Sequence, residues 1–147
     1  MQTRLFSLAF GTFYFAIGIL GFIPGLRTSP PAGSPHVDAT AAYGYFLSQF
    51  PINAVHDVFN IVIGLIGIIV FARLEPARIY CRTLLLLFGA LACIGFLPTL
   101  DTLWGWLPIF GADTWLHAVT AVAAGYFGFV VTEPTYVEPA PAHAAHA

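Results

Sequence analysis

The feature that most constrains this chain is a set of long apolar runs that carry almost no charge. Residues 5–26 contain no Asp, Glu, Lys or Arg over 22 positions, and the runs 52–72, 79–100 and 113–132 are apolar apart from a few polar residues near their starts. A bilayer core of about 30 Å is crossed by about 20 apolar helical residues. Because lipid satisfies no backbone group, and the runs are too long and continuous for barrel strands, we expect four transmembrane helices.

The composition agrees with a membrane protein and argues against other classes. Apolar residues make up 59% of the 147 residues and charged residues only 8%, whereas soluble domains contain about 25% charged residues. Five basic and seven acidic side chains cannot cover a soluble surface, and a chain this apolar does not match the composition of disordered proteins. The net charge of −2, without a basic patch, argues against nucleic-acid binding.

The arginines predict the orientation in the membrane. Arg4, Arg73, Arg78 and Arg82 fall on the side that both termini share, and only Arg27 falls on the other side. Cytoplasmic loops are enriched in Lys and Arg, so we expect a multi-pass protein of the bacterial inner membrane with the N- and C-termini in the cytoplasm. The three tryptophans then lie near the outer surface, where indole rings gather.

The chain is expected to contain one folded domain and a tail. Residues 1–137 form the four-helix transmembrane domain, and residues 138–147 form an Ala/Pro/His tail that has no apolar face and should be disordered. The run 5–26 is too long for a signal peptide and no A-x-A site follows it, so we expect it to be retained. The loop 27–50 is a surface excursion, of which residues 41–49 are apolar enough to lie along the interface.

Two matching patterns predict an internal repeat. The pattern H-x7-G-x2-G occurs in the run 52–72 and again in the run 113–132, and the runs 5–26 and 79–100 both contain G-F-x-P near their ends. Two matches in the same order indicate two copies of one helical hairpin, related by an axis along the membrane normal. The expected fold class is therefore an all-α membrane protein, with four transmembrane helices as two parallel-repeated hairpins in a bundle.

Glycines at helical spacing predict close contacts between the helices. Small residues one turn apart let two helix backbones approach each other in lipid. The glycines expected at such contacts are Gly18, Gly21, Gly64, Gly67, Gly125 and Gly128.

Polar side chains gather near the outer starts of the runs 52–72 and 113–132. Polar groups that face lipid are costly, so we expect them to face the bundle interior. His56 and His117 lie at the same depth, about one turn inside their helices, and we expect them to face each other across the repeat axis. The candidate ligand set or interhelical polar cluster is His56, His117, Asn53, Asn60, Asp57 and Asp113.

Several of these residues also have ordinary structural interpretations. Asp113 is expected to be a helix N-cap, where a carboxylate satisfies free N–H groups and suits the helix dipole. Asp57 either faces the aqueous interface or accepts a hydrogen bond from Asn53. Asn60 lies two turns deep, so its amide needs a partner, and His56 one turn earlier is the expected one.

The same residues carry a resemblance to a known family. The motifs N-x2-H at residues 53–56 and D-x3-H at residues 113–117, together with the glycines of the repeat, are similar to small four-helix bacterial membrane proteins of the domain of unknown function 4383 family. The resemblance covers most of the chain and implies a four-helix membrane fold. The resemblance assigns no activity to the chain and says nothing about a cofactor.

Three functions remain open from the residues alone, of which we favour the first. The chain is a structural bundle that packs in the bilayer, as an accessory subunit of a larger membrane complex, with His56 and His117 forming interhelical hydrogen bonds. Alternatively, the two histidines bind a haem or a chlorophyll-type pigment axially. Thirdly, they form a metal or proton site with Asp57 and Asp113. No HExxH, GxSxG or P-loop pattern occurs, so an enzyme is not expected.

Overall fold

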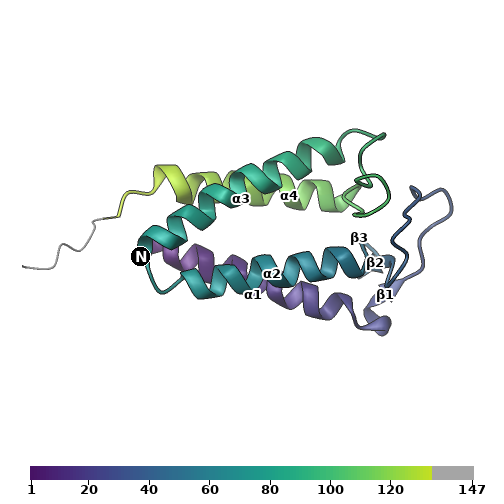
Figure 1. Ribbon diagram of the computed structural model, residues 1–147, viewed down its shortest axis with the longest axis horizontal. Helices are drawn as coiled ribbons and strands as arrows, with labels where there is room; N and C mark the ends of the chain where they lie inside the picture. Colours follow the sequence, from purple (N-terminus) through teal and green to yellow (C-terminus); the bar gives the residue numbers. More distant parts are fainter. Residues whose placement is uncertain (134–147) are drawn as a thin grey trace, which may run out of the picture.

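The structure is a computed structural model that describes residues 1–133, so the tail 138–147 lies outside the described residues. The described part consists mainly of four α-helices (Figure 1), and it also contains a small sheet. The all-α prediction is therefore correct for the helices but omits the sheet. The helices are α1 (Gln2–Gly21), α2 (Ala54–Val70), α3 (Leu74–Gly95) and α4 (Ala112–Gly125).

The helices are arranged as two hairpins. α1 packs along α2, and α3 packs along α4, while α1 and α2 each also contact α3. The amino terminus and the tight turn between α2 and α3 lie at one end of the molecule, whereas the sheet and the α3–α4 loop lie at the other (Figure 1). Two of the described helices, α1 and α3, are long and apolar enough to cross a bilayer, and α2 is a shorter apolar helix.

The helix boundaries differ from the predicted runs by a few residues. α1 ends at Gly21 because Ile23 adopts an extended backbone before Pro24, where a short 3-10 turn begins (η1, Pro24–Leu26); proline disfavours helical geometry in the residue before it. α3 starts at Leu74, earlier than predicted, directly after the tight turn. A π-helical segment, η2 (Tyr126–Val130), continues α4.

A three-stranded antiparallel sheet closes the end of the molecule opposite the amino terminus. It consists of β1 (Arg27–Thr28), β2 (Gly44–Phe46) and β3 (Phe50–Ile52) in the order β1-β2-β3. The segment 41–49, expected to lie along the interface, thus contributes the central strand. Phe46 and Ile52 are buried, and β3 leads through Asn53 directly into α2, so the sheet sets where α2 begins.

An aromatic pair joins the two hairpins in the middle of the core. The ring of Tyr14 on α1 stacks on the ring of Phe88 on α3, with 5.0 Å between their centroids. The hydroxyl of Tyr14 shares a hydrogen bond of 2.6 Å with the hydroxyl of Thr120 on α4. Both aromatic side chains are almost fully buried, so the pair fixes how the hairpins pack against each other.

The first hairpin is held by glycines that lie against backbone. A methyl group at Gly64 would lie 2.6 Å from the carbonyl oxygen of Gly11. A methyl group at Gly67 would lie 2.8 Å from the Cα atom of Gly11. A methyl group at Gly18 would lie 2.6 Å from the carbonyl oxygen of Asp57. Real side-chain carbons do not approach other atoms so closely, so α1 and α2 depend on these glycines.

The second hairpin is looser at the matching positions. A methyl group at Gly125 would meet the side-chain carbons of Leu85 at 3.3 Å and 3.4 Å. At Gly128 it would meet the backbone nitrogen of Arg82 and the Cβ of Cys81, each at 3.2 Å. These contacts are tight, but the contact of Gly125 is with a flexible side chain.

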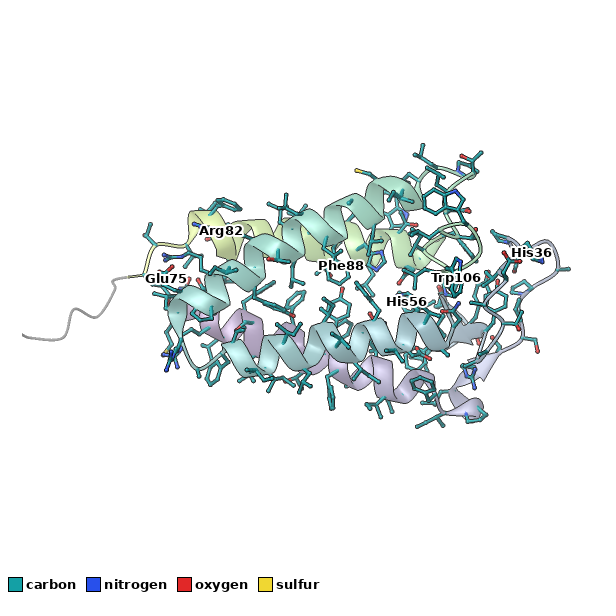
Figure 2. The ribbon with its side chains drawn as sticks, viewed as in Figure 1. His36, His56, Glu75, Arg82, Phe88 and Trp106 are labelled. Atoms are coloured by element: carbon teal, nitrogen blue, oxygen red, sulfur yellow. The ribbon has the colours of Figure 1, made fainter. Side chains whose placement is uncertain are left out.

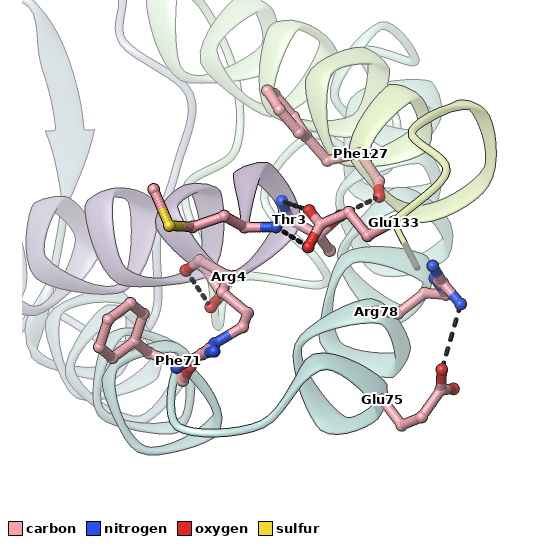
Figure 3. A network of polar contacts seen from close by, with 9 residues as sticks. Thr3, Arg4, Phe71, Glu75, Arg78, Phe127 and Glu133 are labelled. Carbon is pink, nitrogen blue, oxygen red and sulfur yellow. Dashed lines mark hydrogen bonds and ion pairs between the residues drawn. The ribbon is translucent and has the colours of Figure 1, made fainter. Parts of the chain in front are cut away.

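In each hairpin, an arginine of the first helix binds a backbone carbonyl near the end of the second helix. Arg4 Nε donates to the carbonyl oxygen of Phe71 at 2.7 Å (Figure 3), and Arg82 Nε donates to the carbonyl oxygen of Gly128 at 3.0 Å. The guanidinium of Arg4 lies over the ring of Phe71, and that of Arg82 over the ring of Phe129. Each arginine therefore satisfies a carbonyl near a helix end.

The amino terminus is held by the segment that follows η2. The terminal ammonium of Met1 pairs with the carboxylate of Glu133, which also accepts a hydrogen bond of 2.7 Å from the backbone nitrogen of Thr3 (Figure 3). The hydroxyl of Thr3 donates to the carbonyl oxygen of Phe127 at 3.1 Å. These contacts join the first and last described segments of the chain.

Candidate functional site

Asn53 positions the first turn of α2. Its side-chain oxygen accepts the backbone N–H of His56 at 2.9 Å, which makes it the N-cap of the helix. Its amide nitrogen donates to the carbonyl oxygens of Ala39 at 3.0 Å and Trp106 at 2.9 Å. These bonds use both polar atoms of the Asn53 side chain, so it supports His56 and two loops rather than joining a ligand set.

Asp113 does not have the role expected for it. The N-cap of α4 is Gly111, no side chain caps that helix, and Asp113 is its second residue, so the prediction of an N-cap at Asp113 is wrong. Its side chain is instead free to share a face with His117, four residues later. The hydroxyl of Thr114 donates to the carbonyl oxygen of Ile109 at 2.6 Å, which fixes the turn before the helix.

The structure brings together three of the six candidate residues, His56, Asp113 and His117. The Nε2 atom of His56 lies 3.8 Å from Asp113 Oδ2, and the Nε2 atom of His117 lies 3.5 Å from the same oxygen. The two imidazole rings lie 6.0 Å apart between their centroids. His56 lies between the hairpins near the end that carries Trp106 (Figure 2). The three residues form what we call the His–Asp–His cluster.

The cluster is buried and has unsatisfied polar atoms. The exposed fractions of His56, Asp113 and His117 are 1%, 3% and 0%. Within the described chain, Asp113 Oδ2, His56 Nδ1 and both ring nitrogens of His117 have no hydrogen-bond partner. The two N–O separations exceed the 2.7–3.2 Å of an ordinary hydrogen bond, and an unpaired buried polar group costs about 1–3 kcal/mol. The cluster is thus suited to an additional group that contacts all three side chains.

Asn60 and Asp57 lie near the cluster but do not complete it. The side-chain oxygen of Asn60 is buried without a hydrogen-bond partner in the described part of the chain, and no bond to His56 forms. Asp57 is buried against α1, where a methyl group at Gly21 would lie 2.5 Å from its Cγ. Asp57 therefore packs against the first helix of its hairpin rather than facing His117.

A cavity of about 210 Å³ lies beside the His–Asp–His cluster. Its polar lining comes from His56, Asn60 and Asp113. The remaining lining is apolar and comes from α1, α4 and the segment around the sheet: Phe13, Ile17, Phe46, Leu47, Phe50, Ile52 and Leu116. No pattern in the sequence predicts this cavity, because its walls depend on how the sheet packs against the helices.

A tetrapyrrole does not fit between the two histidines. Axial ligation by both imidazoles requires the macrocycle to pass between them. The carboxylate of Asp113 lies beside both imidazoles, with Oδ2 at 3.8 Å and 3.5 Å from the two Nε2 atoms, where it would overlap a wide macrocycle, and the ring of Phe88 packs 4.9 Å from the ring of His117. The geometry therefore disagrees with a haem or chlorophyll-type cofactor at this site, whereas two imidazole nitrogens and a carboxylate oxygen are donors for a single metal ion.

Comparison with known proteins places these residues in one family. The family model described as "Domain of unknown function (DUF4383)" matches residues 4–130. No curated protein and no solved structure matches the chain. The matched region contains both hairpins and the His–Asp–His cluster, and it covers most of the chain. The chain belongs to the DUF4383 family.

Proposed function

We propose that this chain is a structural multi-pass membrane protein in which four helices span the bilayer. The observation that carries the proposal is the distribution of side chains, because large apolar residues are exposed on every helix while polar residues are buried between the helices. Lipid stabilises such an outer surface, and polar groups in a membrane protein face its interior. Exposed apolar residues include Leu5, Phe13, Ile19, Val58, Val62, Ile69, Leu86, Val119 and Val122, and buried polar residues include Thr3, Ser7, Asn60 and Thr120.

The lengths of the helical segments support four crossings. α1 has 20 residues and α3 has 22, and at about 1.5 Å of rise per residue each is long enough for a bilayer core of about 30 Å. α2 has 17 residues, and α4 continues into η2 as one helical segment that runs through residues 112–130. Both are near the lower limit for a transmembrane helix.

The two ends of the molecule support an inner-membrane protein with cytoplasmic termini. Arg4 and the arginines of the α2–α3 turn lie at the end that contains the amino terminus (Figure 1). Trp104 and Trp106 belong to the α3–α4 loop at the opposite end, and their exposed fractions are 73% and 65%. Basic residues favour the cytoplasmic side, and exposed indoles favour the membrane–water interface.

Contacts between matched positions support a parallel internal repeat. Tyr14 and Phe88 both precede the last glycine of their helix by seven residues, and their rings stack on each other. His56 and His117 begin the same H-x7-G-x2-G pattern, and their rings also face each other. Pairs of equivalent residues meet in this way where a twofold axis passes between two copies of a hairpin.

Alkaline-phosphatase fusions test the number and direction of the crossings. Fusions after Arg27 and Leu107 should be active, and fusions after Arg78 and Ala140 should be inactive. The reverse pattern would contradict the orientation. Equal activity on both sides of any one helix would mean that this helix does not cross the membrane.

We further propose that the outward apolar faces of both hairpins contact lipid and the subunits of a larger membrane complex, in which this chain is an accessory subunit. Native electrophoresis of mildly solubilised membranes tests this role. The chain should migrate in a complex that contains other proteins and that decreases in abundance when the chain is deleted. Migration only as a monomer or as copies of itself would contradict an accessory role.

A further inference from the structure

The spacing of the His–Asp–His cluster matches the size of an ion. Three ligand atoms, one each from His56, Asp113 and His117, lie within 4.8 Å of one another. Donors at about 2.0–2.2 Å from a tetrahedral ion are separated from each other by about 3.4 Å. The N–O separations of 3.5 Å and 3.8 Å in the structure are close to this value. A small inward rotation of the imidazoles would bring all three atoms within bonding distance of one ion.

The donor types indicate which ions the cluster would take. Ca²⁺ and Mg²⁺ prefer sites built from oxygen alone. Imidazole nitrogens combined with one carboxylate favour first-row transition ions such as Zn²⁺ and Fe²⁺. Three protein donors leave at least one coordination position open, as in catalytic zinc sites and in iron sites with two histidines and one carboxylate.

The donors are held by rigid parts of the fold. His56 lies in the first turn of α2, which Asn53 caps and ties to two loops. Asp113 and His117 lie one turn apart on α4, which belongs to the other hairpin. Sites built on helices keep their donors more precisely placed than sites built on loops. The cavity that His56 and Asp113 line leaves space beside the cluster for an exchangeable ligand.

We infer that His56, Asp113 and His117 bind one divalent first-row transition-metal ion between the two hairpins. This ion would occupy the space that is too wide for direct hydrogen bonds, and it would satisfy Asp113 Oδ2 and one nitrogen of each imidazole together. The inference goes beyond the structural role proposed above. The competing occupant is an ordered water molecule, which would bridge the same three side chains.

Titration with Co²⁺ as the probe tests the inference directly. The full chain is purified in detergent without a polyhistidine tag, treated with a chelator, and studied with His143 and His146 both replaced by Ala so that these histidines do not bind the probe. One equivalent of Co²⁺ should produce visible d–d absorption bands, which Zn²⁺ should abolish by displacement. Zn²⁺ should also raise the Tm of the chelator-treated protein, because an ion that binds only the folded state stabilises it.

Matched variants show whether the signal comes from this cluster. His56→Gln and His117→Gln keep a polar side chain but remove the imidazole, and each should abolish the bands. Asp113→Asn should weaken Co²⁺ binding by about tenfold or more. Substitution of residues that only hydrogen-bond to a metal ligand already lowers metal affinity by about that factor. His36→Ala is the control, because His36 is exposed beside Asp38 in the loop between β1 and β2, and this variant should bind Co²⁺ normally. Circular dichroism confirms that each variant is folded.

Two results would overturn the metal site. Absence of d–d bands and of any Tm change with the folded parent protein would show that the cluster is a water-bridged packing contact. Bands of equal strength in the parent and in the folded His117→Gln variant would show that Co²⁺ binds elsewhere. Neither result bears on the number of membrane crossings, which the alkaline-phosphatase fusions measure independently.

Discussion

The side-chain amide of Asn53 donates a hydrogen bond of 2.9 Å to the carbonyl oxygen of Trp106, so the start of α2 is tied to the loop that follows α3. The same amide nitrogen binds the carbonyl of Ala39, and the side-chain oxygen caps the backbone of His56. Asn53 therefore holds the backbone of His56, a candidate metal ligand, and connects two loops that lie far apart in the sequence.

Asn53→Asp separates the capping role of Asn53 from its role in holding the loops. Asp and Asn are equally good N-caps, but a carboxylate cannot donate to the carbonyls of Ala39 and Trp106. We expect Asn53→Asp to lower the free energy of unfolding by about 1–3 kcal/mol, the cost of leaving buried carbonyls unpaired. Unfolding by SDS in mixed micelles measures this change in the free energy of unfolding. An Asn53→Asp variant as stable as the parent would show that only the cap matters.

The sequence indicated the helices well because their apolar runs are long and local. The shared H-x7-G-x2-G pattern puts His56 and His117 at matching positions in the sequence, and their ring centroids lie 6.0 Å apart in the structure. The role of Asp113 was not predictable in this way, since a shift of one or two residues in the helix start decides whether a side chain caps the helix or points inward. The sheet escaped prediction because β1 and β2 pair across a loop whose local pattern gives no strand signal.

Gly64 and Gly125 occupy equivalent positions in the two hairpins but should respond differently to substitution. A methyl group at Gly64 meets backbone, including the carbonyl oxygen of Gly11 and the Cα of Phe15, each at 2.6 Å. Gly64→Ala should therefore cost about 1–3 kcal/mol by overpacking. The three atoms nearest to a methyl group at Gly125 are all side-chain carbons of Leu85, which can move, and Ala favours a helix over Gly by about 1 kcal/mol.

Gly125→Ala is thus the matched control, expected to be neutral or slightly stabilising. The Tm values of both variants in one detergent provide the comparison. If Gly125→Ala lowers the Tm as much as Gly64→Ala, the second hairpin is as tightly packed as the first. If neither variant changes the Tm, the close packing of α1 against α2 at Gly64 is contradicted.

Gly105 holds the α3–α4 loop against the loop that joins β1 to β2. Its carbonyl oxygen accepts the backbone N–H groups of Asp38 at 2.9 Å and Ala39 at 3.0 Å. Its φ angle is +84°, and a methyl group there would lie 2.7 Å from Asp38 Cγ. Gly105→Ala combines left-handed backbone strain of about 1–2 kcal/mol with this overlap, so it should destabilise the protein and loosen the loops beside the cluster.

Gly33→Ala is the control for backbone strain alone. Gly33 has nearly the same φ, +85°, but a methyl group there would meet nothing within 4 Å. The Tm should fall less for Gly33→Ala than for Gly105→Ala, and amide hydrogen exchange should increase in residues 38–41 only for the latter. Equal effects on both measurements would mean that the contact with Asp38 contributes nothing.

His56 and His117 should show energetic coupling, because both imidazoles lie within 4 Å of the same Asp113 oxygen. Either single substitution to Ala leaves that buried carboxylate with one neighbour fewer, at a cost of about 1–3 kcal/mol. The second substitution then removes an interaction that is already weakened, so the double variant should cost less than the sum of the two singles. Independent sites add to within about 0.3–0.5 kcal/mol.

A double-mutant cycle measured with chelator and again with saturating Zn²⁺ distinguishes the two forms of coupling. With chelator, the cycle reports direct or water-mediated coupling through Asp113. With Zn²⁺, only the parent protein retains both imidazole ligands, so the coupling should increase. Replacing Tyr14 and Thr120, which share a hydrogen bond nearby, gives a reference cycle that Zn²⁺ should leave unchanged. Additive effects of His56→Ala and His117→Ala under both conditions would show that the two histidines act separately and share no site.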